Sequence, residues 1–304
     1  MDFANRSLIS ITDFSKEECL EILKTAEMFE KDPNQELLSG HLIGTLFFEP
    51  STRTRLSFES AVLRLNGKIT GFSDSSTSSV RKGESLHDTI KTVEKYCDLI
   101  IMRHPLDGSA RYASEISKIP IINAGDGSNQ HPTQTLLDIY SIQKTQGTLE
   151  NLNIVLVGDL KYGRTVHSLV QALSKFNCTF CFVSPEELRM PRRILHELDR
   201  KGIKYEEKHE IEEVLPSADV FYMTRIQKER FSDPVEYENV KDAYILRKDM
   251  ITGTKPNLKI MHPLPRVNEI EQPVDELEEA YYFEQAEKGV YIRQALISLI
   301  LGAK

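Results

Sequence analysis

The residues whose types and spacing could do chemistry begin with Ser51-Thr52-Arg53-Thr54-Arg55, which follows a strand-like apolar run and opens a helix-like pattern. The first N–H groups of a helix have no partner within it, and the helix N-terminus carries a partial positive charge, so an anion is favoured there. The hydroxyls of Ser51, Thr52 and Thr54 and the guanidinium of Arg53 add further donors. The segment predicts a phosphate site, and an ordinary serine N-cap with surface arginines is the alternative.

A second candidate is the Gly/Asn/Asp-rich loop that runs from Asn123 to His131 and enters a helix-like pattern at Pro132. Loops of this kind follow the carboxyl ends of strands, where open α/β sheets bind ligands. His131 could donate to a polarised carbonyl, and Gln134 offers both a donor and an acceptor. A loop histidine taken alone is more often structural or solvated than catalytic.

The segment 157–165 nearly matches the nucleotide-binding P-loop pattern GxxxxGK[ST], and it lies between a predicted strand and a predicted helix. Arg164 stands where the P-loop lysine belongs. A planar guanidinium binds a carboxylate through two hydrogen bonds, whereas the P-loop needs a compact ammonium between phosphates. The segment therefore predicts a carboxylate site, with ATP or GTP binding as an alternative of another class.

Weaker signals come from three further cations and one turn. Arg103 and Arg225 each stand at the carboxyl end of a predicted strand, and Lys82 lies in a Ser/Gly-rich loop at 78–84. Two prolines stiffen the turn His262–Arg266, which leaves carbonyls able to accept hydrogen bonds. The alternative for Arg103 and Arg225 is a solvated strand end. Lys82 could instead lie in a mobile surface loop, and the turn could be only a rigid connection.

Short β-rich apolar runs alternate with helical patterns along the chain, which indicates βαβ units around parallel sheets and an α/β fold. The predicted strands form two series, 42–48, 69–72, 99–103 and 120–123, and then 153–157, 179–183, 204–206, 220–224 and 259–261. Between the series, 132–146 has an apolar helical face and Gly147 as a stop, which predicts a connecting helix. The apolar spacing of 291–301 predicts a terminal amphipathic helix.

Composition bounds the class of protein. The chain has 304 residues, enough for about two domains at roughly 150 residues each. Its 38 Lys and Arg against 46 Asp and Glu give a net charge of −8, which argues against nucleic acid as a partner. No secretory signal is visible in 1–16, and the strongly apolar stretch 295–303 is shorter than the roughly 18 residues of a membrane span. A soluble cytoplasmic protein is expected.

A Cys-x-x-Cys pair, Cys178 and Cys181, adjoins the apolar run 179–183. No second Cys/His pair stands near it, so a core strand is favoured over a zinc or redox site.

Five segments together resemble the catalytic chains of the aspartate carbamoyltransferase family, in the same order and at compatible spacing: 51–55, 131–134, 158–164, 224–227 and 262–266. Ser-Thr-Arg-Thr-Arg and His-Pro-x-Gln are shared with ornithine carbamoyltransferases. The aspartate assignment rests on Arg164, on Arg225 with Gln227, and on His-Pro-Leu-Pro-Arg, where ornithine enzymes typically carry His-Cys-Leu-Pro. Asn268 stands where an acidic residue is common in the family.

The resemblance implies two doubly wound parallel-sheet domains joined by interdomain helices, with the C-terminal helix packing back on the first domain. Residues 1–132 with about 287–304 would bind carbamoyl phosphate, 133–149 would form the connecting helix, and about 150–286 would bind aspartate. The implied reaction transfers the carbamoyl group of carbamoyl phosphate to L-aspartate, giving N-carbamoyl-L-aspartate and phosphate for pyrimidine biosynthesis. No metal or organic cofactor is implied.

The family's site roles fall on matching positions. Carbamoyl phosphate would contact Ser51, Thr52, Arg53, Thr54, Arg103, His131, Gln134 and the carbonyl of Leu264, and L-aspartate would contact Lys82, Arg164, Arg225 and Gln227. The catalytic set would be Arg53, Thr54, Arg103, His131 and Gln134, which would hold the reactants together and stabilise the tetrahedral oxyanion. No enzymic base is identified, so the departing phosphate is the plausible proton acceptor.

Partners and motions are also implied by the resemblance. Ser78, favoured over Ser79 by its offset from Lys82, would reach with Lys82 into a neighbouring subunit, so a homotrimer with shared active sites is expected. Zinc-containing regulatory chains are the family's further partners. The segment 228–242 is expected to be a mobile loop, and domain closure would involve Glu49, Lys161, Tyr162, Glu229 and Arg230. The rival functions are ornithine carbamoyl transfer, a P-loop nucleotide switch and a catalytically silent scaffold.

Overall fold

The computed structural model describes residues 2–226, 231, 233–240 and 243–304. Its internal contacts divide the chain into two compact units, which are 1–137 with 287–304 (unit 1) and 138–286 (unit 2). The helices α5 (Pro132–Gln146) and α9 (Tyr282–Ile300) each contribute residues to both units. The α5 bounds match the predicted connecting helix, and Gly147 follows it with a φ of +71°.

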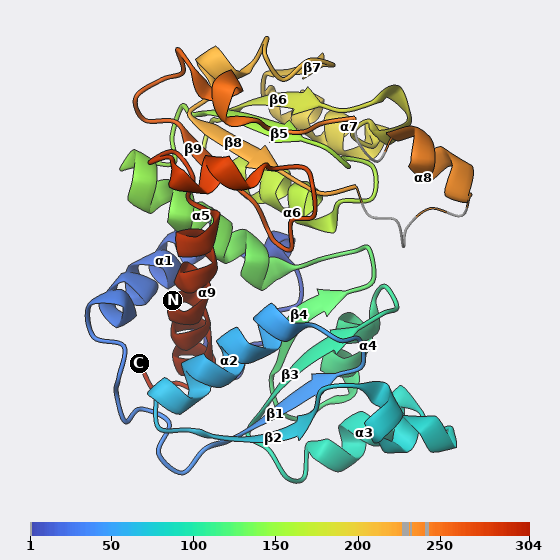
Figure 1. Ribbon diagram of the computed structural model, residues 1–304. Helices are drawn as coiled ribbons and strands as arrows, with labels where there is room; N and C mark the ends of the chain where they lie inside the picture. Colours follow the sequence, from blue (N-terminus) through green and yellow to red (C-terminus); the bar gives the residue numbers. More distant parts are fainter. Residues whose placement is uncertain (1, 227–230, 232, 241–242) are drawn as a thin grey trace. The chain divides into compact units, whose positions relative to one another are not determined.

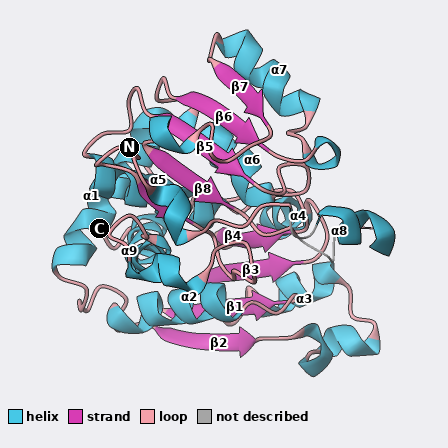
Figure 2. Cartoon of the chain, turned by 45° about the horizontal axis from the view of Figure 1, so that its top comes forward, coloured by secondary structure: helices cyan, strands magenta, loops and turns pink. Residues whose placement is uncertain are grey.

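Unit 1 is built on a four-stranded parallel sheet in the order β2-β1-β3-β4 (Figure 2). Its strands are β1 (Leu42–Phe47), β2 (Lys68–Phe72), β3 (Leu99–His104) and β4 (Ile121–Asp126). The interior strands read as continuous apolar runs because both of their faces are buried, whereas the edge strand β2 is half exposed. The helices of this unit include α1 (Lys16–Lys31), α2 (Thr52–Arg64), α3 (Leu86–Val93) and α4 (Ser109–Ile116).

The C-terminal helix α9 packs on α1 and α2 of unit 1 (Figure 1). Lys288 pairs with Glu30 of α1 at 2.6 Å, and Arg293 donates to Ser57 of α2 at 2.9 Å. The predicted packing of the terminal helix on the first domain is confirmed. The helix begins at Tyr282, nine residues before the predicted start. The prediction missed its first turns because charged residues such as Glu284, Glu287 and Lys288 interrupt the apolar pattern there.

Unit 2 holds a five-stranded parallel sheet in the order β7-β6-β5-β8-β9. Its strands are β5 (Asn153–Val157), β6 (Thr179–Val183), β7 (Tyr205–Lys208), β8 (Val220–Met223) and β9 (Lys259–Met261), and α6 (Arg164–Leu173), α7 (Arg192–Lys201) and α8 (Pro234–Val240) lie in the same unit. Two parallel sheets with helical crossovers confirm the predicted α/β class.

The segment 228–242 was predicted to be a mobile loop, but residues 234–240 of it form the helix α8. Asp233 accepts a hydrogen bond from the Val235 N–H at 2.8 Å, and Pro234 is the first helical residue. An aspartate cap followed by proline starts a helix because the proline N–H would be unpaired there in any case. The other part of the predicted loop, 228–230, 232 and 241–242, lies outside the described residues.

The cysteine pair behaves as core. Cys181 lies within β6, Cys178 directly precedes it, and both thiols are free and buried. Burial raises the pKa of each thiol to about 11, which makes them poor nucleophiles at neutral pH. The core-strand interpretation is confirmed.

Within the part of the chain that the structure describes, no helix has the length and apolar character needed to cross a membrane.

Candidate active site

Most of the residues predicted to bind carbamoyl phosphate follow the strands of unit 1. Because all four strands are parallel, their carboxyl ends meet at one edge of the sheet. The chain leaves β1 toward Ser51, β2 toward Lys82, β3 at Arg103 and β4 toward His131. The groups next to the ends of β1, β3 and β4 therefore lie at one edge of the sheet, as ligand sites of open α/β sheets do, whereas Lys82 lies ten residues beyond the end of β2.

Ser51 is the N-cap residue of α2, but its side chain makes no capping hydrogen bond. Thr52 and Arg53 are exposed and Thr54 is buried at the first turn of the helix. Arg55 instead pairs along the helix with Glu59 at 3.2 Å. The serine is thus not serving the helix as an ordinary cap, and this geometry favours the anion interpretation of the motif.

Arg103 lies at the end of β3 with its guanidinium mostly buried. Its Nη2 is 2.9 Å from Oε2 of Glu49, and its Nη1 donates to the carbonyl of Ala124 at 3.3 Å. These contacts join β3 to β4 and to the segment that follows β1. They hold the guanidinium in one place at the sheet edge, where a substrate anion would meet a fixed cation.

The loop between β4 and α5 is organised by Asp126, which the sequence did not single out. This carboxylate is fully buried and accepts hydrogen bonds from four groups. The donors are the N–H of Gly108 (2.9 Å), the amides of Asn123 (2.9 Å) and Asn129 (3.1 Å), and the N–H of Gln130 (3.2 Å). An aspartate within a Gly/Asn-rich loop is the signal that could have identified it, since such residues often bond nearby backbone.

This loop delivers His131 directly before α5. The imidazole is buried, with 5% of the residue exposed, and its backbone carbonyl accepts from the N–H groups of Gln134 (3.0 Å) and Thr135 (3.1 Å). Gln134 is half-buried in the first helical turn. Both predicted side chains therefore belong to one rigid turn, which is what a group aimed at a reacting carbonyl requires.

Ser78 and Lys82 lie on the segment after β2. Ser78 is the N-cap of a short 3₁₀ helix, Ser79–Lys82, and its hydroxyl donates to the carbonyl of Ser75 at 2.8 Å. Lys82 is exposed at the end of that helix, and Gly83 caps it in the left-handed conformation. The segment thus contains two short 3₁₀ helices, Ser75–Thr77 and Ser79–Lys82.

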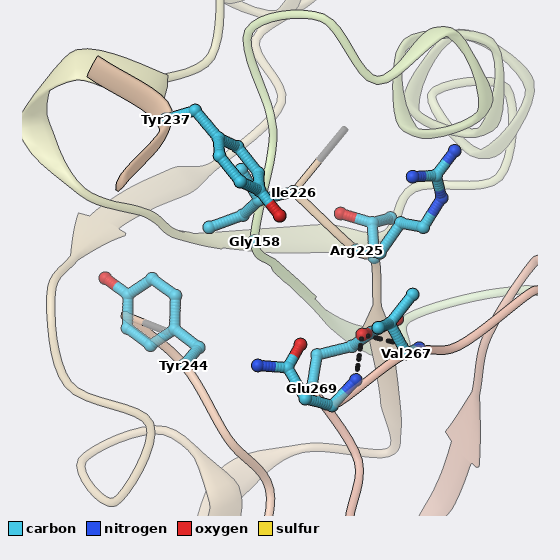
Figure 3. Close-up of a pocket in the computed structure, with 9 residues that line it drawn as sticks. Gly158, Arg225, Ile226, Tyr237, Tyr244, Val267 and Glu269 are labelled. Carbon is cyan, nitrogen blue, oxygen red and sulfur yellow. Dashed lines mark hydrogen bonds between the residues drawn. The ribbon is translucent and has the colours of Figure 1, made fainter. Parts of the chain in front are cut away.

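In unit 2, Arg164 begins α6 after β5, Arg225 follows β8, and Leu264 follows β9. A pocket opens at this edge of the sheet (Figure 3), and it is lined by Gly158, Thr224, Arg225, Ile226, Tyr237, Tyr244, Val267, Asn268 and Glu269. The structure therefore brings Arg225 to a pocket together with Asn268. Gln227, the other predicted aspartate contact of this segment, lies outside the described residues, as do Glu229 and Arg230.

A buried histidine and glutamate shape the turn after β9. Nε2 of His262 lies 2.8 Å from Oε1 of Glu269, and Nδ1 of His262 accepts the N–H of Leu264 at 2.8 Å. The other oxygen of Glu269 accepts from the N–H groups of Val267 (3.0 Å) and Asn268 (3.1 Å). The two side chains thus set the path of the turn that presents Leu264 and lines the pocket (Figure 3).

Burial lowers the pKa of His262, and the bond that its Nδ1 accepts agrees with a neutral imidazole whose Nε2 donates to Glu269. Burial alone would raise the pKa of Glu269, but the hydrogen bond from His262 and those from the backbone lower it overall. The pair is therefore a neutral histidine beside a carboxylate. Neither residue was assigned a role from the sequence beyond the stiff turn.

A second chain of buried hydrogen bonds holds the backbone of the same turn at His262. Gln285 accepts the N–H of His262 at 2.9 Å and donates to Asp138 at 2.6 Å, and Asp138 also accepts from the hydroxyl of Tyr222 at 2.8 Å. The network links α9, α5 and β8 within unit 2.

Among the described residues, no group of three or more His, Cys, Asp or Glu side chains could hold a metal ion.

Comparison with known proteins assigns both halves of the chain to one family. The aspartate/ornithine carbamoyltransferase family matches through its carbamoyl-P binding domain at 6–144 and its Asp/Orn binding domain at 150–300. The chain is 58% identical over 299 residues to the aspartate carbamoyltransferase catalytic subunit of Phocaeicola vulgatus, covering 98% of this chain and 96% of that one.

Solved structures agree in fold. The aspartate transcarbamoylase of Trypanosoma cruzi, solved with carbamoyl phosphate and aspartate, matches with a TM-score of 0.94 at 36% identity, covering 98% of both chains. The catalytic subunit of M. jannaschii aspartate transcarbamoylase matches with a TM-score of 0.90 at 52% identity, covering 97% of both chains.

Two parallel α/β sheets that match a carbamoyl-P binding domain and an Asp/Orn binding domain define a protein of the carbamoyltransferase class. The chain belongs to the aspartate/ornithine carbamoyltransferase family. Within that family it groups with the aspartate carbamoyltransferase catalytic subunits.

Proposed function

We infer that this chain is an aspartate carbamoyltransferase, which transfers the carbamoyl group of carbamoyl phosphate to the amine of L-aspartate. The observation that carries the carbamoyl phosphate half is the start of α2, where the Ser51 side chain makes no capping hydrogen bond and lies next to Thr52, Arg53 and Thr54. The aspartate half is supported by Arg225 at the pocket of unit 2 and by the 58% identity to an aspartate carbamoyltransferase catalytic subunit. Relatives that share the fold were solved with carbamoyl phosphate and aspartate. The products are N-carbamoyl-L-aspartate and phosphate, so the reaction serves pyrimidine biosynthesis.

We assign the carbamoyl phosphate to unit 1. The donors at the start of α2 and the guanidinium of Arg103 would bind its phosphate, and Thr54, Arg103 and His131 would polarise the carbamoyl oxygen. Gln134 would contact the carbamoyl nitrogen. As the amine attacks, negative charge grows on that oxygen, and donors fixed in advance stabilise it without reorganising. The departing phosphate would take the proton of the amine, because no residue here is assigned as a base.

We assign the carboxylates of L-aspartate to Arg164, Arg225 and Gln227, with Lys82 as a further contact. Support comes from the pocket at Arg225 and from the position of Arg164 at the start of α6. The carbonyl of Leu264 would help to seat the reactants. Residues 158–165 fall within the matched Asp/Orn binding domain, which favours this assignment over a P-loop.

The proposed assembly is a homotrimer in which Ser78 and Lys82 enter a neighbouring subunit's active site. Several similar chains are called catalytic subunits, which supports regulatory chains as further partners. We propose a cytoplasmic location, in agreement with four buried cysteines that form no disulfide bond with one another.

The deciding experiment measures product formation from carbamoyl phosphate with L-aspartate and, separately, with L-ornithine. We expect turnover with aspartate and none above background with ornithine. Turnover on ornithine alone would reassign the acceptor, and binding of both ligands without turnover would indicate a silent scaffold. Calorimetry with Mg-ATP and Mg-GTP tests the P-loop alternative, for which we expect no saturable binding at 158–165.

A further inference from the structure

Arg293 of the C-terminal helix α9 places a buried guanidinium between α2 and α5, the two helices whose first turns carry groups assigned to carbamoyl phosphate. The residue is 3% exposed. Its Nη1 donates to the hydroxyl of Ser57 on α2 at 2.9 Å, and its Nη2 donates to the hydroxyl of Thr133 on α5 at 3.4 Å. Its Cζ lies 4.7 Å from the centre of the Phe58 ring. One side chain of unit 1 thus contacts α2 and α5 together.

The two hydroxyls stand close to the groups assigned to substrate. Ser57 lies one helical turn after Arg53 and Thr54, and Thr133 lies between His131 and Gln134 in the first turn of α5. A helix is stiff over one turn, so fixing Ser57 and Thr133 relative to each other also fixes the starts of the two helices. The relative position of the first turns of α2 and α5 decides whether the donors assigned to the phosphate and those assigned to the carbamoyl group can bind the same molecule of carbamoyl phosphate.

The chemistry of the contact requires an arginine. Its planar fork directs separate N–H groups at two acceptors, whereas the ammonium of a lysine is a single point at the end of a flexible stem. A buried charge is costly, and hydrogen bonds together with the aromatic face of Phe58 offset that cost.

Gly289 shows independently that the backbone leaves space for this guanidinium. A Cβ at this position of α9 would lie 2.3 Å from Nη1 of Arg293 and 3.4 Å from the hydroxyl of Ser57. The absence of a side chain, one turn before Arg293, lets the guanidinium lie against the helix surface and reach both hydroxyls.

We propose that Arg293 is a positioning residue for carbamoyl phosphate, which acts through Ser57 and Thr133 to hold the start of α2 in register with the start of α5. This inference rests on the proposed function of unit 1. Arg293 is not among the residues assigned to either substrate, so its proposed effect is on the geometry of the groups that are.

The test uses pairs of variants that differ in one hydroxyl. Thr133→Val removes the acceptor and keeps the shape, whereas Thr133→Ser restores the acceptor, and Ser57→Ala is matched by Ser60→Ala on the same helix. We expect Thr133→Val and Ser57→Ala to raise the KM for carbamoyl phosphate and the Kd for inorganic phosphate by about fivefold to tenfold. The KM for aspartate should change by less than about twofold, and Thr133→Ser and Ser60→Ala should behave like wild type.

Coupling is tested by combining Thr133→Val with Arg293→Lys. If both act through one contact, the double variant should raise the phosphate Kd by less than the product of the single effects. If Arg293→Lys does not fold, the Thr133 and Ser57 variants with their matched controls still test the proposal.

The positioning role is overturned if Thr133→Val and Ser57→Ala lower the Tm but leave the carbamoyl phosphate KM and the phosphate Kd unchanged. It is also overturned if the KM values for both substrates rise together. A wild-type chain that neither transfers carbamoyl groups nor binds phosphate would instead contradict the proposed function itself.

Discussion

At the scale of single residues, the candidate site depends on side chains that are held in place by partners from other segments of the chain. Arg103 is positioned by Glu49 and by the carbonyl of Ala124, and His262 is positioned by Glu269. Residue types alone predicted the cations, but their partners were not predicted. A cation with a fixed neighbour presents one geometry to a substrate, and catalysis by proximity needs this.

Arg225 provides a test of the aspartate assignment. Arg225→Lys keeps the charge but loses the planar fork, so we expect the aspartate KM to rise by about tenfold or more, with the carbamoyl phosphate KM nearly unchanged. Arg247→Lys is the matched control, because Arg247 pairs with Asp249 elsewhere in unit 2. Steady-state kinetics with each substrate varied decide the matter, and an unchanged aspartate KM would contradict the assignment.

His262 predicts a pH dependence of stability. Burial lowers its pKa in the folded chain, so below its ordinary value of 6.5 the unfolded chain binds the proton more readily. The free energy of unfolding should therefore fall as the pH drops below 6.5, by up to about 1.4 kcal/mol per pH unit for one proton.

Burial also lowers the pKa of His104 and His167, so they add to the same trend. The share of His262 is the difference in slope between wild type and His262→Gln, measured by urea unfolding at several pH values. Equal slopes would show that His262 titrates alike in both states.

At the scale of elements, hydrophobic periodicity located the strands well. β5, β6 and β9 have the predicted bounds, and the other strands differ by a few residues at their ends. The helix α8 was missed because 228–242 is dominated by charge, although Asp233-Pro234 is a local start signal. Ends depend on caps and on neighbouring strands, which an apolar pattern does not record.

Gly158 shows how closely two elements must approach at the pocket. Its φ is +112°, and a Cβ would lie 2.3 Å from the carbonyl oxygen of Thr224 after β8. We expect Gly158→Ala to destabilise the protein by about 2–4 kcal/mol, through backbone clash and left-handed strain, and to raise the aspartate KM.

The matched control is Gly253→Ala, since Gly253 also has a positive φ, +78°, but has no atom within 4 Å of its Cβ position. This variant should cost only about 1–2 kcal/mol, the strain of the left-handed conformation. Equal losses of unfolding free energy in the two variants would show that the close approach to Thr224 contributes nothing.

At the scale of the whole molecule, the net charge of −8 conceals the cations that matter. Arg53, Lys82 and Arg103 belong to unit 1, and Arg164 and Arg225 belong to unit 2. Both substrates are anions. In the proposed function Arg53 and Arg103 of unit 1 bind carbamoyl phosphate, whereas Arg164 and Arg225 of unit 2 bind aspartate together with Lys82 from unit 1 of a neighbouring subunit.

Sharing of active sites is testable by mixing variants. If Lys82 enters a neighbouring subunit's site, then Lys82→Ala chains and Arg225→Ala chains, each nearly inactive alone, should regain activity when they are dissociated and reassembled together. Mixed rings would contain sites with both residues intact, because a ring places one chain's surface against a different surface of the next. Activity that remains absent after confirmed reassembly would place Lys82 outside the shared site.

The sequence by itself determined the α/β class, the places of the strands along the chain, the helix 132–146 and the segments to which the chemistry is assigned. These features are local, since apolar periods, helix starts and turn residues are read within a few positions. Only the tertiary structure decided that Asp126 accepts from the N–H of Gly108 across 18 positions, that Glu269 contacts His262, and that Arg293 reaches Ser57 across 236 positions. Buried polar groups must find partners wherever the fold brings them together, and no local pattern specifies which partners these will be.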